Sequence, residues 1–114
     1  MGRGLRAAVM AVSMVACASR PALPPAGPPV TAEAPARVYG ARWCRHTRAA
    51  LAWFAARQVP VRFMDVERDP EAMEEMGQRA SAAGIGGRGI PLVEVRGRVL
   101  RGFDAEWIER ALED

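Results

Sequence analysis

The segment from Ala18 to Ala36 is built mainly from alanine, proline and glycine, and it confines the folded part of the chain to the residues after it. Its sequence, ASRPALPPAGPPVTAEAPA, has almost no large apolar side chain, so it cannot bury enough surface to fold. Prolines favour an extended and semi-rigid chain. We therefore expect residues 17–36 to be a flexible tether and residues 37–114 to form one small domain.

Residues 1–16 have the order of regions that is typical of a secretory signal peptide. Arg3 and Arg6 form a basic start, and an almost wholly apolar run follows from Ala7 to Ala16. This run is too short to cross a bilayer as a helix, which takes about 20 residues. We expect residues 1–16 to be a signal peptide.

The end of the apolar run, Met14-Val15-Ala16-Cys17, resembles the lipobox of bacterial lipoproteins. This resemblance implies that Cys17 is lipidated after cleavage and that the protein is lipid-anchored to a bacterial membrane outside the cytoplasm, on the periplasmic side. Several acyl chains anchor a domain stably, whereas one does so only marginally. An ordinary cleaved signal with an incidental cysteine, or an uncleaved anchor, stays open as an alternative.

The charge of the mature chain is nearly balanced. Without Arg3 and Arg6, 14 of the 16 basic side chains remain against 13 acidic ones. A nucleic-acid partner would favour a strongly basic face, so we expect none. The lipid anchor is then the only contact with a membrane that we expect.

Hydrophobic periodicity predicts the element order β-α-β-α-β-β-α. The clearest helix starts at Asp69, a good N-cap, followed by Pro70 at the first helical position, and ends before Gly84. The strand over 60–66 is expected to be mostly buried. The predicted strands are 37–40, 60–66, 90–95 and 98–103, and the predicted helices are 44–57, 70–83 and 105–114.

Cys44 lies at the junction of the first strand and the first helix, where its pKa can be lowered. A helix N-terminus offers free amides and partial positive charge, and the arginines at positions 42, 45 and 48 add full charges. Thr47 lies one turn on, on the same helix face, so its hydroxyl can donate to the sulfur. The pattern favours a reactive thiol at Cys44, assisted by Thr47, over a small buried apolar side chain.

Three separated stretches resemble the glutaredoxins, a branch of the thioredoxin fold: VYGARWC at 38–44, Gly89-Ile90-Pro91, and PLVEVRGRVLRGFD at 91–104. The resemblance covers essentially all of 37–114. It implies an α/β, thioredoxin-like fold with a four-stranded mixed sheet flanked by three helices. It also implies a thiol-disulfide oxidoreductase whose redox-active centre is Cys44.

The same resemblance implies a substrate groove. Pro91 would be cis and face the sulfur, the backbone of Ile90 would pair with bound glutathione, and Asp104 would hold its glutamyl end. The family lysine three residues before the cysteine is Ala41 here, and Arg42 can supply its charge from the next position. Trp43 can stack on a bound peptide or shield the sulfur. The glycine pair that usually precedes the phenylalanine is replaced by Arg101-Gly102.

With Cys17 lipidated, Cys44 has no partner thiol, and the chemistry that remains is monothiol. We expect Cys44 to take the small thiol from a mixed disulfide and to be released by a second thiol, with glutathione or another low-molecular-weight thiol as cosubstrate. No cofactor and no metal are expected, because one chain lacks the ligands for zinc or a cluster. We expect a monomer that acts on thiol or mixed-disulfide substrates. The alternative is a redox-inactive thioredoxin-fold module that binds an extended peptide.

Overall fold

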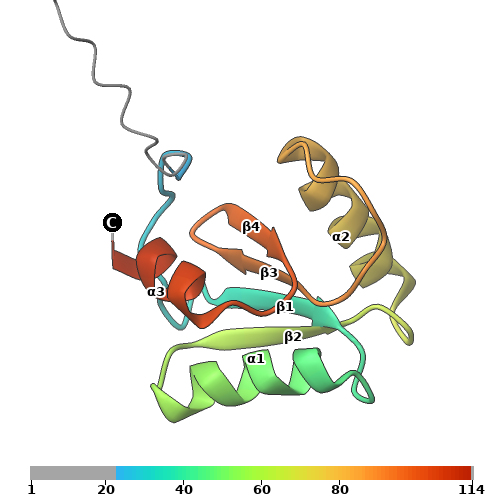
Figure 1. The fold of residues 1–114 in the computed structure, drawn as a ribbon, viewed down its shortest axis with the longest axis horizontal. Coiled ribbons are helices and arrows are strands. Elements are labelled where there is room, and N and C mark those ends of the chain that lie inside the picture. The colour runs from blue at the N-terminus through green and yellow to red at the C-terminus, as the bar shows by residue number, and fades with distance from the viewer. Residues whose placement is uncertain (1–22, 114) are drawn as a thin grey trace, which may run out of the picture.

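A computed structural model describes residues 23–113 and confirms the predicted order of elements (Figure 1). Each helix and strand lies within about two residues of its predicted bounds. The strands are β1 (Ala36–Gly40), β2 (Val61–Asp65), β3 (Leu92–Val95) and β4 (Arg98–Arg101), and the helices are α1 (Arg45–Ala56), α2 (Pro70–Ala82) and α3 (Ala105–Glu113).

The strands form one mixed sheet in the order β2-β1-β3-β4. β1 pairs in parallel with β2 and antiparallel with β3, and β3 pairs antiparallel with β4. Tyr39 is opposite Leu92, and Leu92 is opposite Arg101. The end of β1, the start of β3 and the end of β4 therefore meet at one end of the sheet, which we call the Gly40 end. The turn at Arg96-Gly97 lies at the other end.

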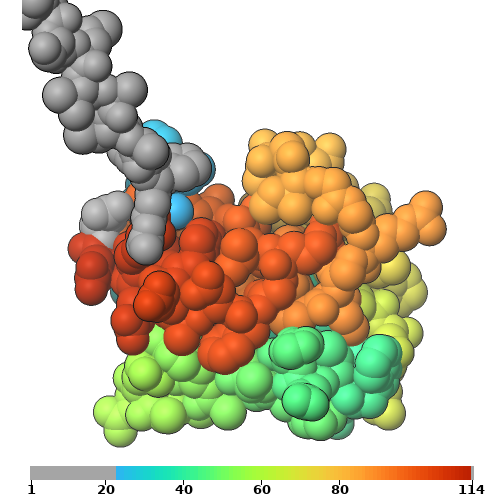
Figure 2. All heavy atoms as spheres, viewed as in Figure 1, coloured from blue at the N-terminus to red at the C-terminus, as the bar shows by residue number. Residues whose placement is uncertain are grey.

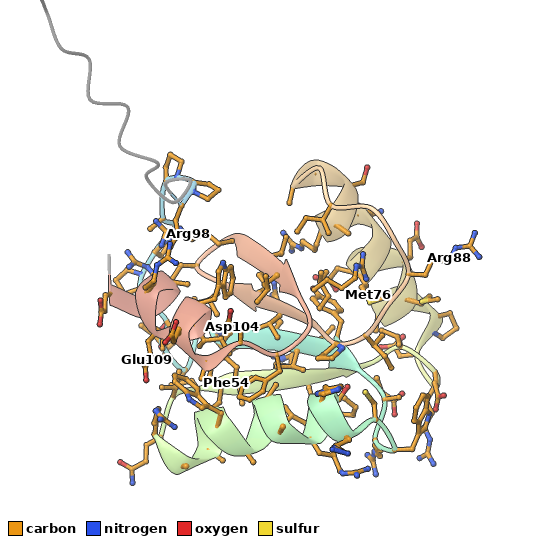
Figure 3. All side chains as sticks on the ribbon, viewed as in Figure 1. Phe54, Met76, Arg88, Arg98, Asp104 and Glu109 are labelled. Carbon is orange, nitrogen blue, oxygen red and sulfur yellow. The ribbon has the colours of Figure 1, made fainter. Side chains whose placement is uncertain are left out.

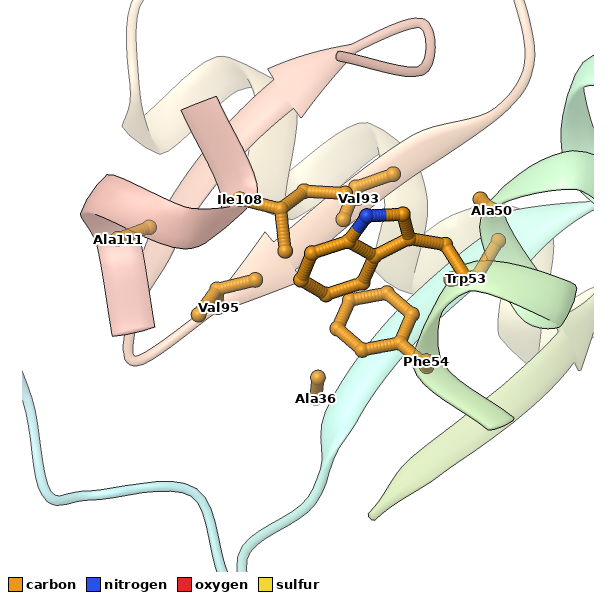
Figure 4. Close-up of a cluster of buried hydrophobic side chains, with 9 residues drawn as sticks. Ala36, Ala50, Trp53, Phe54, Val93, Val95, Ile108 and Ala111 are labelled. Carbon is orange, nitrogen blue, oxygen red and sulfur yellow. The ribbon is translucent and has the colours of Figure 1, made fainter. Parts of the chain in front are cut away.

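Helices α1 and α3 cover one face of the sheet and α2 covers the other (Figure 1). Alternate side chains of β1 and β3 point toward α1 and α3, where Trp53 and Phe54 pack edge to face with their ring centroids 5.3 Å apart (Figure 4). The remaining members of this core cluster are Ala36, Val38, Ala50, Val93, Val95, Ile108 and Ala111.

A group of charged side chains joins α2 to the sheet. Glu94 of β3 is buried; it accepts a hydrogen bond from Arg37 at 3.1 Å and forms an ion pair with Arg79 at 3.2 Å. Arg79 also reaches Glu75 at 3.2 Å. Tyr39 lies fully buried on the same face. A buried carboxylate is costly unless it is paired, and two arginines supply that pairing here.

The strand β2 differs from its prediction. We expected a mostly buried strand, but Arg62 is exposed and the other four residues are only half-buried. β2 is an edge strand with one neighbour, β1, so part of its surface stays open to solvent. Its apolar composition alone could not distinguish an edge strand from a central one.

Residues 23–35, the described part of the expected tether, lie against the domain at the Arg96 turn. The amide of Gly27 donates to the carbonyl of Arg96 at 2.8 Å, and Arg98 Nε donates to the carbonyl of Pro24 at 2.7 Å. Val30 packs on the core beneath α1 and α3. The expected signal peptide and Cys17 lie outside the described residues. Within 23–113, no helix has the length and apolar character that a membrane span requires.

Candidate active site

Cys44 ends the loop that joins β1 to α1, residues 41–44, which we call the cysteine loop. Its amide donates to the carbonyl of Ala41 at 3.0 Å, and its carbonyl accepts the amide of Arg48 at 3.0 Å. Cys44 is therefore the N-cap residue of α1, and the helix begins one residue later than predicted. Only 8% of the Cys44 surface is exposed, and it is the only cysteine within residues 23–113.

The pKa of the Cys44 thiol is lowered, first by the Thr47 hydroxyl. Burial of the thiol works against this, and the backbone amides of Thr47 and His46 and the charge of Arg48 add to it. Free amides at a helix start and a nearby cation both favour the thiolate. The first turn of α1 holds no acidic residue that would oppose them. The site therefore favours the nucleophilic form of the thiol.

Thr47 is fully buried, and its hydroxyl reaches hydrogen-bond geometry with no group among residues 23–113. A buried hydroxyl without a partner costs free energy. The hydroxyl proton can rotate, so it is available to the sulfur once Cys44 ionises. The structure thus brings together Cys44 and Thr47, the two predicted catalytic residues.

Arg48 holds the cysteine loop in place. Its Nη1 atom donates to the carbonyl of Arg42 at 3.1 Å and to the carbonyl of Trp43 at 2.8 Å. Sequence reasoning treated Arg48 only as a nearby charge and missed these bonds. The available signal was its position one helical turn after Cys44, from which a long side chain points back toward the helix start.

Arg42 and Trp43 link the cysteine loop to the end of β2 and to the connection that follows it. Arg42 Nε lies 3.8 Å from a carboxylate oxygen of Asp65, and the indole nitrogen of Trp43 donates to Glu67. Trp43 is 65% exposed, so its ring is held on the surface and offers an aromatic face to a bound group. His46 is also exposed, and its side chain is not among the groups that lower the pKa of Cys44.

Ile90 and Pro91 lie at the Gly40 end of the sheet, and the peptide bond between them is cis. Pro91 is fully buried, and its carbonyl accepts the amide of Gly102 at 2.7 Å. The pairing of Tyr39 with Leu92 puts Pro91 level with Gly40, directly before the cysteine loop. The sheet register therefore brings Cys44, Thr47 and Pro91 to one end of the molecule.

Asp104 lies at the start of α3 (Figure 3). It is exposed, its carboxylate accepts the amide of Trp107 at 3.2 Å and its carbonyl accepts that of Ile108 at 3.1 Å. These bonds make it the cap of α3. None of them joins Asp104 to the residues around Cys44.

Residues 23–113 contain no group of three or more His, Cys, Asp or Glu side chains that could hold a metal ion. Cys44 is the one sulfur nucleophile among them, and its surroundings stabilise the thiolate. What this arrangement can do chemically is thiol exchange with a disulfide.

The fold matches solved structures at low sequence identity. The glutaredoxin grx-1 from Archaeoglobus fulgidus has a TM-score of 0.57 and 16% identity, over 69% of this chain and 86% of that one. A point mutant of the thioredoxin-like protein BC3987 has a TM-score of 0.57 and 21% identity, over 68% and 92%. At these identities the likeness establishes the fold, which is thioredoxin-like as predicted.

A search of curated proteins gives no match. A family model described as Glutaredoxin matches residues 36–100, which is more than half of the chain. This match runs from the start of β1 almost to the end of β4, so it includes Cys44, Thr47 and Pro91. The chain therefore belongs to the glutaredoxin family.

Proposed function

We propose that this protein is a thiol-disulfide oxidoreductase that works by a monothiol mechanism through Cys44. The observation that carries the proposal is the position of Cys44 at the start of α1, where its pKa is lowered and Thr47 stands where a second cysteine would complete a Cys-x-x-Cys pair. A thiolate is the reactive form in disulfide exchange. Membership of the glutaredoxin family supports the same reaction class.

The reaction has two exchange steps. The Cys44 thiolate attacks one sulfur of a mixed disulfide, a new disulfide forms at Cys44, and the client thiolate leaves and takes a proton from water. A second small thiolate then attacks the disulfide at Cys44 and releases the thiolate of Cys44. One disulfide is consumed and one is formed, so the electrons come from the small thiol, for which glutathione is the first candidate.

Thr47 serves both steps by the same physical means. Its hydroxyl stabilises negative charge on the Cys44 sulfur. That charge is present before the first attack and returns when Cys44 leaves in the second step. A threonine cannot resolve the intermediate disulfide as a cysteine would, so release depends on a thiol from solution.

We expect the substrate to bind at the surface around the Gly40 end of the sheet. We assign it to Arg42, Trp43, the Ile90-Pro91 segment and, at the start of α3, Asp104. Exposed Trp43 supplies apolar area and Arg42 supplies charge for a carboxylate. Asp104 already caps α3, so a bound amine would have to share its carboxylate with the amide of Trp107.

The mechanism is tested with the full chain and a glutathionylated peptide. Cys44→Ser should abolish turnover, whereas Cys17→Ser should leave it unchanged, because Cys44 needs no second cysteine. Loss of turnover in Cys17→Ser would show a two-cysteine mechanism. If the Cys44 thiol titrates at or above its ordinary pKa of about 8.5 and no thiol supports turnover, the protein is instead a redox-inactive peptide-binding module.

We further propose that Cys17 carries the lipid anchor and that the domain acts outside the cytoplasm, on the periplasmic side of a bacterial membrane. The support is the resemblance of Met14 to Cys17 to a lipobox. Mass spectrometry of the protein from membranes should find an acylated Cys17 as the first residue. An unmodified Cys17, or an intact residue 1, would contradict the anchor.

A further inference from the structure

Arg101, the last residue of β4, reaches across to the loop that leads into Pro91. We call this loop, residues 83–91, the proline loop. The Nε atom of Arg101 donates to the carbonyl of Gly86 at 3.1 Å, and its Nη1 atom donates to the carbonyl of Gly89. Figure 2 shows the proline loop (orange) on the surface of the molecule, between α2 and the end of β4.

The proline loop has few side chains with which to hold itself. Four of its residues are glycine, and Gly84 and Gly87 have positive φ angles of 69° and 89°. Glycine loses more conformational freedom than other residues when it is fixed. Ile85 packs on the core beneath α2, but the stretch from Gly86 to Gly89 is exposed. The bonds from Arg101 are thus a main restraint on this stretch.

The geometry of Arg101 suits this task. A guanidinium is planar and carries several donors in fixed directions, so it can bond two carbonyls at once. The aliphatic part of the side chain lies along the loop, with Cδ 3.4 Å from where a Cβ of Gly89 would be. The stem of Arg101 therefore runs beside Gly89, within van der Waals range of the loop.

The backbone around Arg101 fixes the other side of Pro91. Arg101 pairs with Leu92 in the sheet, and the next amide, that of Gly102, donates to the Pro91 carbonyl at 2.7 Å. Pro91 is therefore restrained on two sides. The Gly102 amide bonds the carbonyl of Pro91, and the Arg101 side chain bonds the loop just before Pro91. The two restraints come from neighbouring residues, Arg101 and Gly102.

We propose that Arg101 is a positioning residue for the redox site: it fixes the proline loop so that half-buried Ile90, backed by the buried Pro91, presents a rigid surface to a disulfide at Cys44. This inference rests on the proposed thiol-disulfide exchange. Arg101 itself touches neither the sulfur nor, in this role, the substrate. Its effect passes through the loop and should appear only with substrates that use that surface.

The test compares three variants of the full chain. Arg101→Met keeps the aliphatic stem and removes both bonds, and Arg101→Lys keeps the charge without the planar pair of donors. Arg88→Met is the matched control, because Arg88 lies in the same loop, extends away from the body of the domain and makes no hydrogen bond or ion pair among residues 23–113 (Figure 3). Arg101→Met and Arg88→Met each remove one positive charge near the proline loop, and Arg101→Lys keeps it.

Two rates at Cys44 separate positioning from general damage. One is alkylation by iodoacetamide, which needs only an accessible thiolate, and the other is formation of the mixed disulfide with a glutathionylated peptide in a single turnover. For Arg101→Met we expect the second rate to fall about tenfold, with alkylation within about twofold of wild type. Amide hydrogen exchange over residues 86–90 should rise about tenfold or more. Arg101→Lys should be intermediate, and Arg88→Met should match wild type.

Unchanged exchange over residues 86–90 in Arg101→Met would show that Arg101 does not restrain the loop. Faster exchange with both cysteine rates unchanged would show that the restraint does not serve the site, and an equal fall of both rates would show general damage instead. Each result overturns the proposal. If the wild type forms the mixed disulfide but no second thiol completes turnover, only the proposed function fails, because these rates are measured before that step.

Discussion

The side chain of Thr47 lies directly against the backbone of Gly40. A Cβ atom at position 40 would be 2.2 Å from the Thr47 hydroxyl oxygen and 2.6 Å from its methyl carbon. Gly40 is the last residue of β1, and its φ angle is not positive, so close approach and not backbone freedom is what requires glycine here. This contact limits how near the first turn of α1 can come to the sheet. It therefore also determines the position of Cys44.

Gly40→Ala should destabilise the protein by about 1–3 kcal/mol, because both residues are buried and α1 must move to admit the methyl group. Moving Thr47 should also raise the pKa of Cys44. Gly77→Ala is the matched control: Gly77 is in α2 with nothing within 4 Å of an added Cβ, and the change should stabilise by about 0.5–1 kcal/mol. Urea unfolding measures the free energy of unfolding of both variants. Equal effects of Gly40→Ala and Gly77→Ala would contradict the contact between Gly40 and Thr47.

Thr47→Val should raise the pKa of Cys44 toward its ordinary value, because the hydroxyl is the largest factor that lowers it. Valine keeps the shape that packs on Gly40. A hydrogen bond to a charged group contributes about 1.5 kcal/mol or more, so alkylation of Cys44 near neutral pH should slow by about tenfold. Alkylation rates across pH measure this, and a profile identical to that of wild type would show that Thr47 has no influence on the thiol.

The same substitution should change how stability depends on pH. A thiol whose pKa is lower in the folded state adds stability that is fully present above the unfolded pKa, about 8.5, and is lost as pH falls through the folded value. As pH rises from the folded pKa to the unfolded pKa, the reduced wild type should therefore gain stability, and Thr47→Val should gain less. Cys44→Ala is the control and should show no contribution from this thiol.

Arg48→Met should raise the pKa of Cys44 and loosen the cysteine loop, whereas Arg45→Met should do neither. Arg48 lowers the pKa by its charge and bonds the carbonyls of Arg42 and Trp43, while Arg45 is not among the groups that shift the pKa. Both arginines are exposed, so the charge effect should shrink as salt rises. The thiolate absorbance and hydrogen exchange of residues 42–44 provide the measurements. Equal effects of Arg48→Met and Arg45→Met would show that only the overall positive charge around Cys44 matters, and not the position of Arg48.

Tyr39 is the only tyrosine in the chain, so the tyrosinate absorbance reports one residue. Its pKa is raised to about 12, first by burial and then by the charge of Glu94, and the neighbouring Glu75 raises it further. A group with a raised folded pKa gives stability that is full below the unfolded value, about 10, and is lost as pH rises toward the folded value. Stability should therefore decline between pH 10 and 12, and this part of the decline should be absent in Tyr39→Phe. A wild-type tyrosinate titration at the unfolded value would show that Tyr39 is not buried beside these carboxylates.

The parts of the fold that local signals determine could be predicted from the sequence. Asp69 accepts the amide of Glu71 at 3.0 Å, and Pro70 starts α2, as capping rules require. The strand-to-helix junction at Cys44 could be predicted from the same kind of local signal. Thr47 could be placed near the sulfur because a helix repeats every 3.6 residues.

Contacts between distant segments could not be predicted in this way. No local signal in the sequence marks Glu94 as buried, yet it is buried and paired with Arg37 and Arg79, which come from two other elements. Arg101 appeared only as a departure from a glycine pair, and its two bonds to the proline loop depend on where that loop passes. Such pairings are set by sheet order and loop path, which hydrophobic periodicity does not encode.

The docking of residues 23–35 beside the Arg96 turn has a practical consequence for anyone who handles this protein. Leu23 and Cys44 lie toward opposite ends of the sheet, since Pro24 and Gly27 bond Arg98 and Arg96 while Cys44 follows Gly40. The strands between these ends span about 15 Å. A bead, sensor chip or fluorescent label coupled at position 23 should therefore leave the end of the sheet that carries Cys44 unobstructed.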